Sequence, residues 1–233
     1  MTMKARAADR YFEGLTRAAG IAVLVVMASI AAFLLWRSLP SFSANSSNFL
    51  TETAWFPDQE TPRFGIAALL FGTVTAAVLA MLLAVPVGLG TALFITYYAN
   101  RRFAGVLAFI IDLLAAVPSI IFGLWALQTL MPRMDGTGRW LDAHVGFIPF
   151  FDNTTDLYGK SLFVAGVVLA IMVLPTVSAL SREVFKQVPR SNTEAALALG
   201  ATRWEMLRMA VLPFGRSGVI SAAMLGLGRA LGE

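Results

Sequence analysis

Between Arg63 and Arg101 the chain carries no charged residue, and residues 64–100 read FGIAALLFGTVTAAVLAMLLAVPVGLGTALFITYYAN. A helix needs roughly 20 apolar residues to cross the hydrocarbon core of a bilayer. This run is too long for one upright span and too short for two spans with a turn. We therefore predict one tilted helix, broken near residues 86–90, because proline removes a backbone donor and glycine loosens the turn.

The composition of the whole chain also indicates a membrane protein. Of its 233 residues, 58% are hydrophobic and 14% are charged, whereas a soluble domain carries about 25% charged residues. A water-soluble globule and a disordered chain are both excluded, since neither accommodates so much apolar surface. The absence of cysteine excludes thiolate metal sites and disulfides. A single histidine, His144, leaves no histidine-rich cluster, so we expect neither a metal site nor a cofactor.

Four further apolar stretches complete a predicted all-α, polytopic transmembrane bundle of five spans. They lie at residues 18–37, from Asp112 to Met131, from Ser161 to Ser181, and from Arg216 to the last residue, Glu233. The first also resembles a secretory signal, but its apolar run exceeds the roughly 7–15 residues of a signal peptide. We therefore favour an uncleaved first span.

The distribution of charge predicts the orientation of the bundle. Lys and Arg dominate the tail at residues 1–17 and the segments beside residues 101–102 and 182–216, whereas acids dominate the segments at 38–63 and 132–160. Cytoplasmic loops carry the excess of basic residues, so the N-terminal tail is predicted to be cytoplasmic. Residues 38–63 and 132–160 are then predicted to be external loops, with His144 an ordinary loop residue. The basic balance needs no nucleic-acid partner to explain it.

Residues 188–213 form the most informative loop and read VPRSNTEAALALGATRWEMLRMAVLP. Ser191 with Glu194, and Thr202 with Glu205, have the spacing of a capping box. Gly200 lies between the two runs, where the end of a helix often requires a positive φ. We predict two short helices that meet at an angle at Gly200.

The surface of this loop leaves two interpretations open. Small side chains at Ala195 and Ala196 would let another protein approach closely, and Trp204, Met206 and Leu207 would offer it apolar anchors. An amphipathic helix lying on the lipid surface has a similar pattern. The residues alone do not choose between these two.

A family resemblance favours protein docking. Glu194-Ala195-Ala196, followed by Gly200 and then by Leu212-Pro213, resembles the EAA loop of ABC-importer permeases. The resemblance implies that residues 188–213 hold a coupling helix that docks on a cytoplasmic ATPase dimer, and that residues 64–233 form the permease domain. The chain lacks the GxxxxGK[ST] phosphate loop, so we expect that it is not itself an enzyme.

Two further stretches resemble one branch of that family. LAAVPSIIFG at 114–123 and LGLGRALGE at 225–233 are similar to permeases of the phosphate-specific (Pst-type) importer, and closer to its C subunit than to its A subunit. This implies import of inorganic phosphate across the bacterial inner membrane, with a second permease subunit and an external phosphate-binding protein. Permeases for sulfate or molybdate share the EAA loop, so they remain alternatives, as does a scaffold or sensor that transports nothing. The family pattern continues into a sixth span, so we expect the chain to be a fragment.

Arg229 and Glu233 are the predicted substrate residues. Arg229 follows Arg216 by 13 residues, which is roughly 20 Å along a helix. A charge at such depth is costly and usually faces a water-filled path or a partner. Glu233 lies four residues later and could pair with Arg229 on the same helical face. A guanidinium suits phosphate because its planar fork donates two parallel hydrogen bonds, although a salt bridge that only fixes helix packing remains open.

Overall fold

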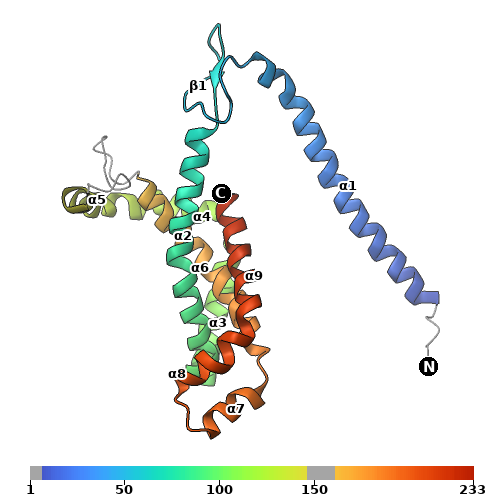
Figure 1. Cartoon of the computed structure of the whole chain (residues 1–233), viewed down its shortest axis with the longest axis vertical. Helices are drawn as coiled ribbons and strands as arrows, with labels where there is room; N and C mark the ends of the chain where they lie inside the picture. The colour runs from blue at the N-terminus through green and yellow to red at the C-terminus, as the bar shows by residue number, and fades with distance from the viewer. Residues whose placement is uncertain (1–6, 146–160) are drawn as a thin grey trace. The chain divides into compact units, whose positions relative to one another are not determined.

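The computed structural model describes residues 7–145 and 161–233, and most of these are helical (Figure 1). The chain divides into two compact units, one ending at Leu69 and the other beginning at Leu70. Each unit is described by itself below.

The first unit consists of a long helix and a small hairpin. Helix α1 spans Ala7–Ala44, and strands β1 (Trp55–Phe56) and β2 (Arg63–Phe64) pair in antiparallel fashion. The aromatic rings of Phe49 and Phe64 meet edge to face, with centroids 6.3 Å apart. The helix continues to Ala44, so the predicted loop at 38–63 begins later than expected. The Ser38 hydroxyl donates to the carbonyl of Leu35, which is an interaction within the helix rather than with a loop.

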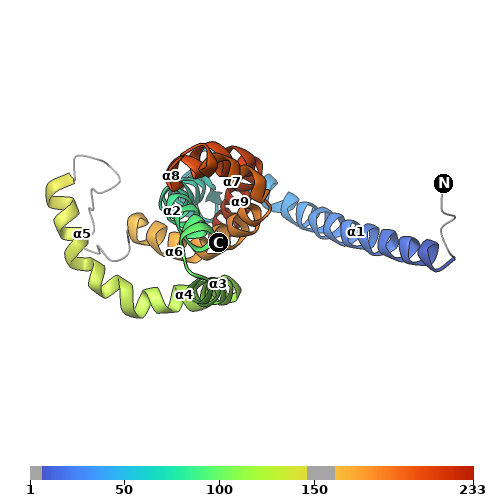
Figure 2. The ribbon, with the colours of Figure 1, turned by 90° about the horizontal axis from the view of Figure 1, so that it is seen from below.

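The second unit is built around three helices that pack side by side: α2 (Ala67–Leu93), α6 (Leu162–Lys186) and α9 (Leu212–Leu231) (Figure 2). Small residues let their backbones approach closely, as is typical of helix packing in membranes. A Cβ added at Gly226 would lie 2.8 Å from the side chain of Val177, and one at Gly88 would lie 3.2 Å from it. Large side chains are therefore excluded from both contacts.

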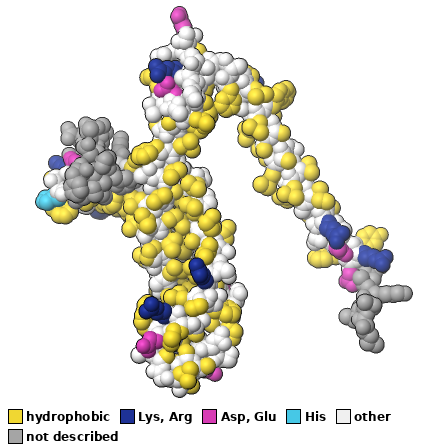
Figure 3. Space-filling model, viewed as in Figure 1, with side chains coloured by type: hydrophobic (Ala, Val, Ile, Leu, Met, Phe, Trp, Pro, Cys, Tyr) yellow, Lys and Arg dark blue, Asp and Glu magenta, His cyan; other side chains and the backbone are white. Residues whose placement is uncertain are grey.

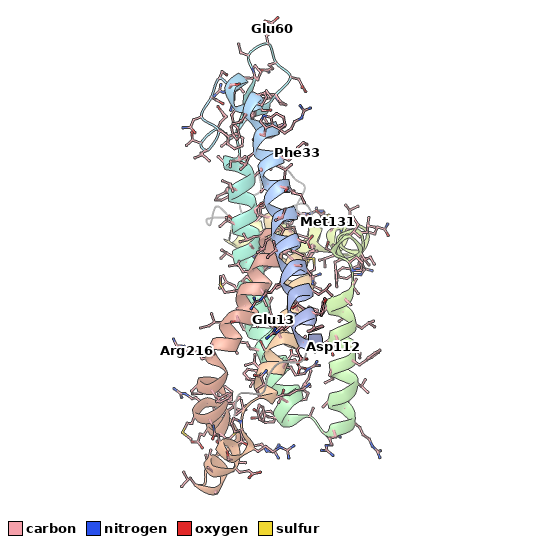
Figure 4. All side chains as sticks on the ribbon, turned by 90° about the vertical axis from the view of Figure 1, so that its right-hand side faces the viewer. Glu13, Phe33, Glu60, Asp112, Met131 and Arg216 are labelled. Carbon is pink, nitrogen blue, oxygen red and sulfur yellow. The ribbon has the colours of Figure 1, made fainter. Side chains whose placement is uncertain are left out.

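A bent segment flanks these three helices. Helix α3 (Arg101–Ala116) is followed by α4 (Ser119–Trp125), a π-helical turn, and α5 (Met131–Val145). The axis bends by 93° between α3 and the helix that follows it. The bend lies at Val117-Pro118, because the residue before a proline is driven to an extended conformation. Figure 4 labels Asp112 partway along α3 and Met131 where α5 begins.

The prediction of an all-α membrane bundle is confirmed. Four helices among the described residues are long and apolar enough to cross a membrane, and the bent segment from Arg101 to His144 would make a fifth span. The four are Asp9–Ala44, Ala67–Tyr98, Leu162–Lys186 and Arg203–Leu231. Hydrophobic side chains cover much of the face shown in Figure 3.

The predicted break near residues 86–90 is wrong. Helix α2 continues through Pro86 to Leu93, and a π-helical turn then carries the chain to Tyr98. Proline removes one backbone hydrogen bond, but the packing of α2 against α6 compensates. Ala84, Gly88 and Ala92 all lie buried, on both sides of Pro86.

Three other boundaries also differ from the predictions. The third span begins at Arg101 rather than Asp112, because the Asn100 side chain caps the helix by accepting from the backbone N–H of Phe103. Apolar helix precedes Arg216, since the fifth candidate span starts at Arg203. Part of the predicted loop at 132–160 is helix α5, in which the His144 ring stacks on Trp140 at 4.6 Å. Residues 146–160 of that loop lie outside the described residues.

Candidate functional site

Two short helices at one end of the second unit form an angular connection between α6 and α9. They are α7 (Arg190–Ala198) and α8 (Arg203–Met206), and we call residues 190–206 the elbow (Figure 1). Gly200 lies between them with a φ of 85°, a backbone conformation that residues with a side chain rarely adopt. The prediction of two short helices meeting at Gly200 is confirmed.

Each helix of the elbow starts differently. At α8 the predicted capping box is formed: the Thr202 hydroxyl accepts from the backbone N–H of Glu205, whose carboxylate accepts from the backbone N–H of Thr202. At α7 the prediction is wrong, because the helix starts at Arg190 and Ser191 provides no cap. Pro189 occupies the capping position with φ −58°, a value already suited to entering a helix.

The outer surface of the elbow carries the residues predicted to dock. Glu194, Ala195 and Gly200 are exposed, and Ala196 is half-buried. Leu199 is 90% exposed and Trp204 is 60% exposed, which is unusual for large apolar side chains on a polar surface. Beside them lies an open recess of about 550 Å³, lined by Ala196, Leu199, Gly200, Ala201, Glu205, Met209 and Ala210.

The inner surface of the elbow is fixed to the helical bundle. Met206 and Leu207 are buried, so their predicted role as anchors for another protein is wrong. They instead pack with Phe185 at the end of α6 and with Ala92 in α2. The Tyr97 hydroxyl also donates to the carbonyl of Phe185 at 3.0 Å. The elbow is therefore packed directly against the ends of α2 and α6.

Arg229 lies where α9, α6 and α3 meet. Its Nη1 atom donates to the hydroxyl of Thr176 in α6 at 3.0 Å and to the carbonyl of Ala115 in α3 at 3.4 Å. Both acceptors are neutral, so neither cancels the positive charge of the guanidinium. An incompletely buried cation with neutral partners can attract an anion.

Glu233 does not pair with Arg229 in the part of the chain that the structure describes. Helix α9 is described as far as Leu231, and Glu233 is the last residue of the given sequence. Glu233 instead lines a recess of about 390 Å³. Other residues of its wall are Gly72, Thr73, Ala76, Ser119, Phe122, Gly123, Ala126, Met131, Leu162, Ala165, Val168, Leu169, Met172 and Ala230. Ser119 thus lies beside a cavity next to the Arg229 helix.

A second buried guanidinium, which the sequence did not single out, lies in α6. The side chain of Arg182 is 7% exposed, and its Nη2 atom donates to both carboxylate oxygens of Asp112 at 2.9 and 3.0 Å. Glu183 accepts from the same atom at 3.3 Å. The Nε and Nη1 atoms of Arg182 are buried, with no hydrogen-bond partner among the residues that the structure describes. The available signal was the presence of both Asp112 and Arg182 within apolar helices, where charges usually pair.

The described residues contain no group of three or more His, Cys, Asp or Glu side chains that could hold a metal ion. The guanidinium of Arg229, by contrast, can donate hydrogen bonds to an anion.

Comparison with known proteins places the chain in one class. Residues 84–233 match the family described as "Binding-protein-dependent transport system inner membrane component". A solved structure titled as inward-facing conformations of the MetNI methionine ABC transporter has a TM-score of 0.50 at 22% identity. That match covers 72% of this chain and 68% of the other, and it supports the fold alone.

Curated relatives resemble the chain over almost its whole length. "Phosphate transport system permease protein PstC 2" of Mycobacterium tuberculosis is 48% identical over 232 residues, covering 98% of this chain and 72% of the relative. "Phosphate transport system permease protein PstC" of Xylella fastidiosa (strain Temecula1) is 41% identical, covering 97% of this chain and 70% of that protein. The relatives' names describe transport permeases.

The fold and the matches therefore define a multi-pass inner-membrane component of an ABC import system. The chain belongs to the family of binding-protein-dependent transport system inner membrane components. Members of this family work together with other components of an import system. The resemblance seen in the sequence is thereby confirmed.

Proposed function

We propose that the chain is a permease subunit of an ATP-driven importer of inorganic phosphate. The observation that carries this proposal is Arg229, a guanidinium inside an apolar helical bundle whose recorded acceptors are both neutral. A charge within a membrane segment marks a substrate path by default. The relatives named as phosphate permeases supply the choice of anion.

Phosphate suits this position because of its shape and charge. A guanidinium can donate two parallel hydrogen bonds to two oxygens of one tetrahedral anion, which an ammonium cannot do. Inside an apolar bundle such bonds are stronger than in water, because the surroundings screen them less. Glu233 lies on the wall of the neighbouring recess, where its carboxylate would repel an anion that is not held by Arg229.

The remaining partners follow from the elbow. Its exposed Leu199 and Trp204 would dock on a cytoplasmic ATPase dimer, with Glu194, Ala195, Ala196 and Gly200 at the contact. A second permease subunit would complete the translocation path, and an external phosphate-binding protein would deliver the anion. Because the elbow is packed against the ends of α2 and α6, ATP binding and hydrolysis in the partner would switch which side of the membrane the path faces.

Uptake measurements test the choice of substrate. The complete importer, expressed in cells that lack other phosphate uptake systems, should accumulate labelled phosphate, and Arg229→Ala should reduce uptake to background while the subunits still assemble. Arg216→Ala is the matched control, because it removes an exposed guanidinium from the same helix. Normal uptake in Arg229→Ala would remove Arg229 from the path. Competition by sulfate or molybdate, but not by phosphate, would favour a different oxyanion.

The role of the elbow has its own test. Gly200→Val places a branched side chain at a φ of 85°, which costs about 1–2 kcal/mol, so coupling of ATP hydrolysis to uptake should be lost. Gly136→Val in α5 is the control, since a Cβ there meets nothing within 4 Å and the backbone needs no positive φ. Unchanged coupling in Gly200→Val would contradict docking through the elbow. A scaffold that transports nothing would show no uptake even in the wild type.

The proposed orientation places the N-terminal tail and the elbow in the cytoplasm. The chain has no cysteine, so single cysteines can be introduced at Glu194 in α7 and at Glu60, which Figure 4 labels at the tip of the hairpin loop. A membrane-impermeant maleimide should label the Glu60→Cys variant in intact cells and the Glu194→Cys variant only after the cells are opened. The reverse pattern would overturn the orientation.

A further inference from the structure

The side chain of Thr176 in α6 accepts a hydrogen bond from Arg229. Its hydroxyl oxygen lies 3.0 Å from Nη1 of Arg229, which also donates to the carbonyl of Ala115. The two acceptors come from α6 and α3, whereas the arginine belongs to α9. Three helices thus converge on one nitrogen of one guanidinium.

The choice of nitrogen determines which edge of the guanidinium remains available. In arginine, Nη1 lies on the same side as Cδ, whereas the N–H groups of Nε and Nη2 point in parallel along the opposite edge. The recorded bonds of Arg229 both use Nη1. The edge formed by Nε and Nη2 has no recorded acceptor within residues 7–145 and 161–233. This is the edge that grips two oxygens of an oxyanion.

Helices α6 and α9 also pack together through apolar residues beside Thr176. Helices α6 and α9 already meet through Gly226, at which an added Cβ would lie 2.8 Å from Val177 and 3.0 Å from Val173. Both valines are fully buried. Since close apolar packing joins the helices, the hydroxyl of Thr176 acts on the guanidinium rather than on the interface.

We propose that Thr176 is a positioning residue, which holds Nη1 of Arg229 so that the Nε and Nη2 edge is presented to a tetrahedral oxyanion. The proposal rests on the proposed function, because it assigns Arg229 to the transport path. Without the hydroxyl of Thr176, the guanidinium of Arg229 can rotate about its side-chain torsions. Its Nε and Nη2 atoms then face the anion for only part of the time. Removing the hydroxyl should therefore weaken binding of the anion, but it should not change assembly of the importer or its maximal rate of uptake.

The test compares Thr176→Val, which keeps the branched shape and removes the acceptor, with Thr176→Ser, which keeps the hydroxyl. Uptake of phosphate, sulfate and molybdate is measured in cells that express the complete importer. We expect Thr176→Val to raise the apparent KM for the transported anion by about three- to tenfold, the effect of losing one hydrogen bond. The maximal rate and the amount of assembled importer should stay unchanged, and Thr176→Ser should restore the KM.

Thr91→Val is the matched control, because the Thr91 hydroxyl donates only within its own helix, to the carbonyl of Val87. It should leave the KM unchanged. An unaltered KM in Thr176→Val, or a fall in maximal rate and assembly alone, would overturn the positioning role. If the wild type carries sulfate or molybdate instead of phosphate, the proposed substrate is wrong, and a raised KM for that anion still supports Thr176. Uptake of none of the three anions by the wild type would overturn both proposals.

Discussion

Two arginines reach helix α3 within one turn of each other, and their surroundings differ. Arg182 donates to the carboxylate of Asp112, whereas Arg229 donates to the carbonyl of Ala115 and the hydroxyl of Thr176. Arg182 is almost fully buried, and Arg229 is only partly buried. Carboxylates compensate the positive charge of Arg182, whereas the described acceptors of Arg229 are neutral.

We infer from this difference that Arg182 has a structural role and Arg229 a functional one. A guanidinium with a carboxylate partner must give up that partner before it can hold an anion, and breaking a buried ion pair costs about 3–5 kcal/mol. A guanidinium with neutral acceptors can bind an anion without first breaking an ion pair. This contrast favours Arg229 as the residue that we propose to contact the substrate, although both arginines lie within apolar helices.

The largest expected effect comes from removing the partner of Arg182. Asp112→Ala leaves a buried guanidinium with Glu183 as its only carboxylate among the described partners. We expect a loss of about 2 kcal/mol in unfolding free energy, less than for a fully buried pair because the Asp112 side chain is 50% exposed. Thermal unfolding of the complex in detergent measures this loss. Asp135→Ala, which breaks an exposed pair with Arg139 in α5, is the control and should change stability by less than about 0.5 kcal/mol.

The next prediction separates the effect of guanidinium geometry from the effect of positive charge, by replacing each arginine with lysine. Arg229→Lys keeps the charge but loses the planar fork, so the apparent KM for uptake should rise about tenfold, the equivalent of one charge-assisted hydrogen bond. Arg182→Lys can still pair with Asp112 through a single nitrogen, so its uptake should stay within about twofold of the wild type. Equal effects at both positions would break the distinction between them.

A smaller effect is expected on stability at Arg229. Arg229→Met removes a charge that no acidic side chain within residues 7–145 and 161–233 neutralises, and an apolar replacement of similar volume is often neutral or stabilising. The unfolding free energy should therefore stay the same or rise by up to about 1 kcal/mol, while uptake is lost. A large drop in the unfolding temperature would show instead that Arg229 is a packing residue.

The smallest effect concerns a third arginine, in the first unit. Arg63 donates to Glu52 at 2.6 Å, and the backbone N–H of Ala54 also donates to that carboxylate. These bonds, first that from Ala54 and then that from Arg63, hold the pKa of Glu52 below its usual 4.5. The carboxylate therefore stabilises the hairpin above pH 4.5, and this contribution is lost as the pH falls through the lowered pKa.

An acid titration followed by the fluorescence of Trp55, which pairs with Phe64 in the hairpin, checks this expectation. The transition should lie below pH 4.5 in the wild type and should vanish in Glu52→Gln. A transition above that value would mean that the carboxylate is not stabilised by these bonds. Because the Arg63 side chain is 61% exposed and the backbone bond from Ala54 remains, Arg63→Ala should shift the transition only slightly.

Local features of the fold could be predicted from the sequence. The turn at Gly200 and the capping box at Thr202 depend on residues within three or four positions of each other, so their spacing is sufficient. The break expected at Pro86 failed because the packing of Ala84 and Gly88 against α6 outweighs one missing hydrogen bond. That packing depends on residues distant in the sequence.

The candidate site could be predicted only in part for the same reason. Arg229 stood out because a lone charge in an apolar helix is rare. Its acceptor Thr176 lies 53 residues away, and Asp112 lies 70 residues from Arg182. No spacing rule connects such pairs. Glu233 stays a predicted substrate residue, and it lines the recess beside α9.

The close seam between α2 and α6 has a mechanical consequence. Ala77, Ala80 and Ala84 are fully buried on α2, and at Gly88 the backbone comes close enough to exclude a side chain. Helix α3, by contrast, has one buried residue, Ile111, along its described length. The seam between α2 and α6 leaves no room for one helix to slide past the other, so we expect these two helices to move as one body.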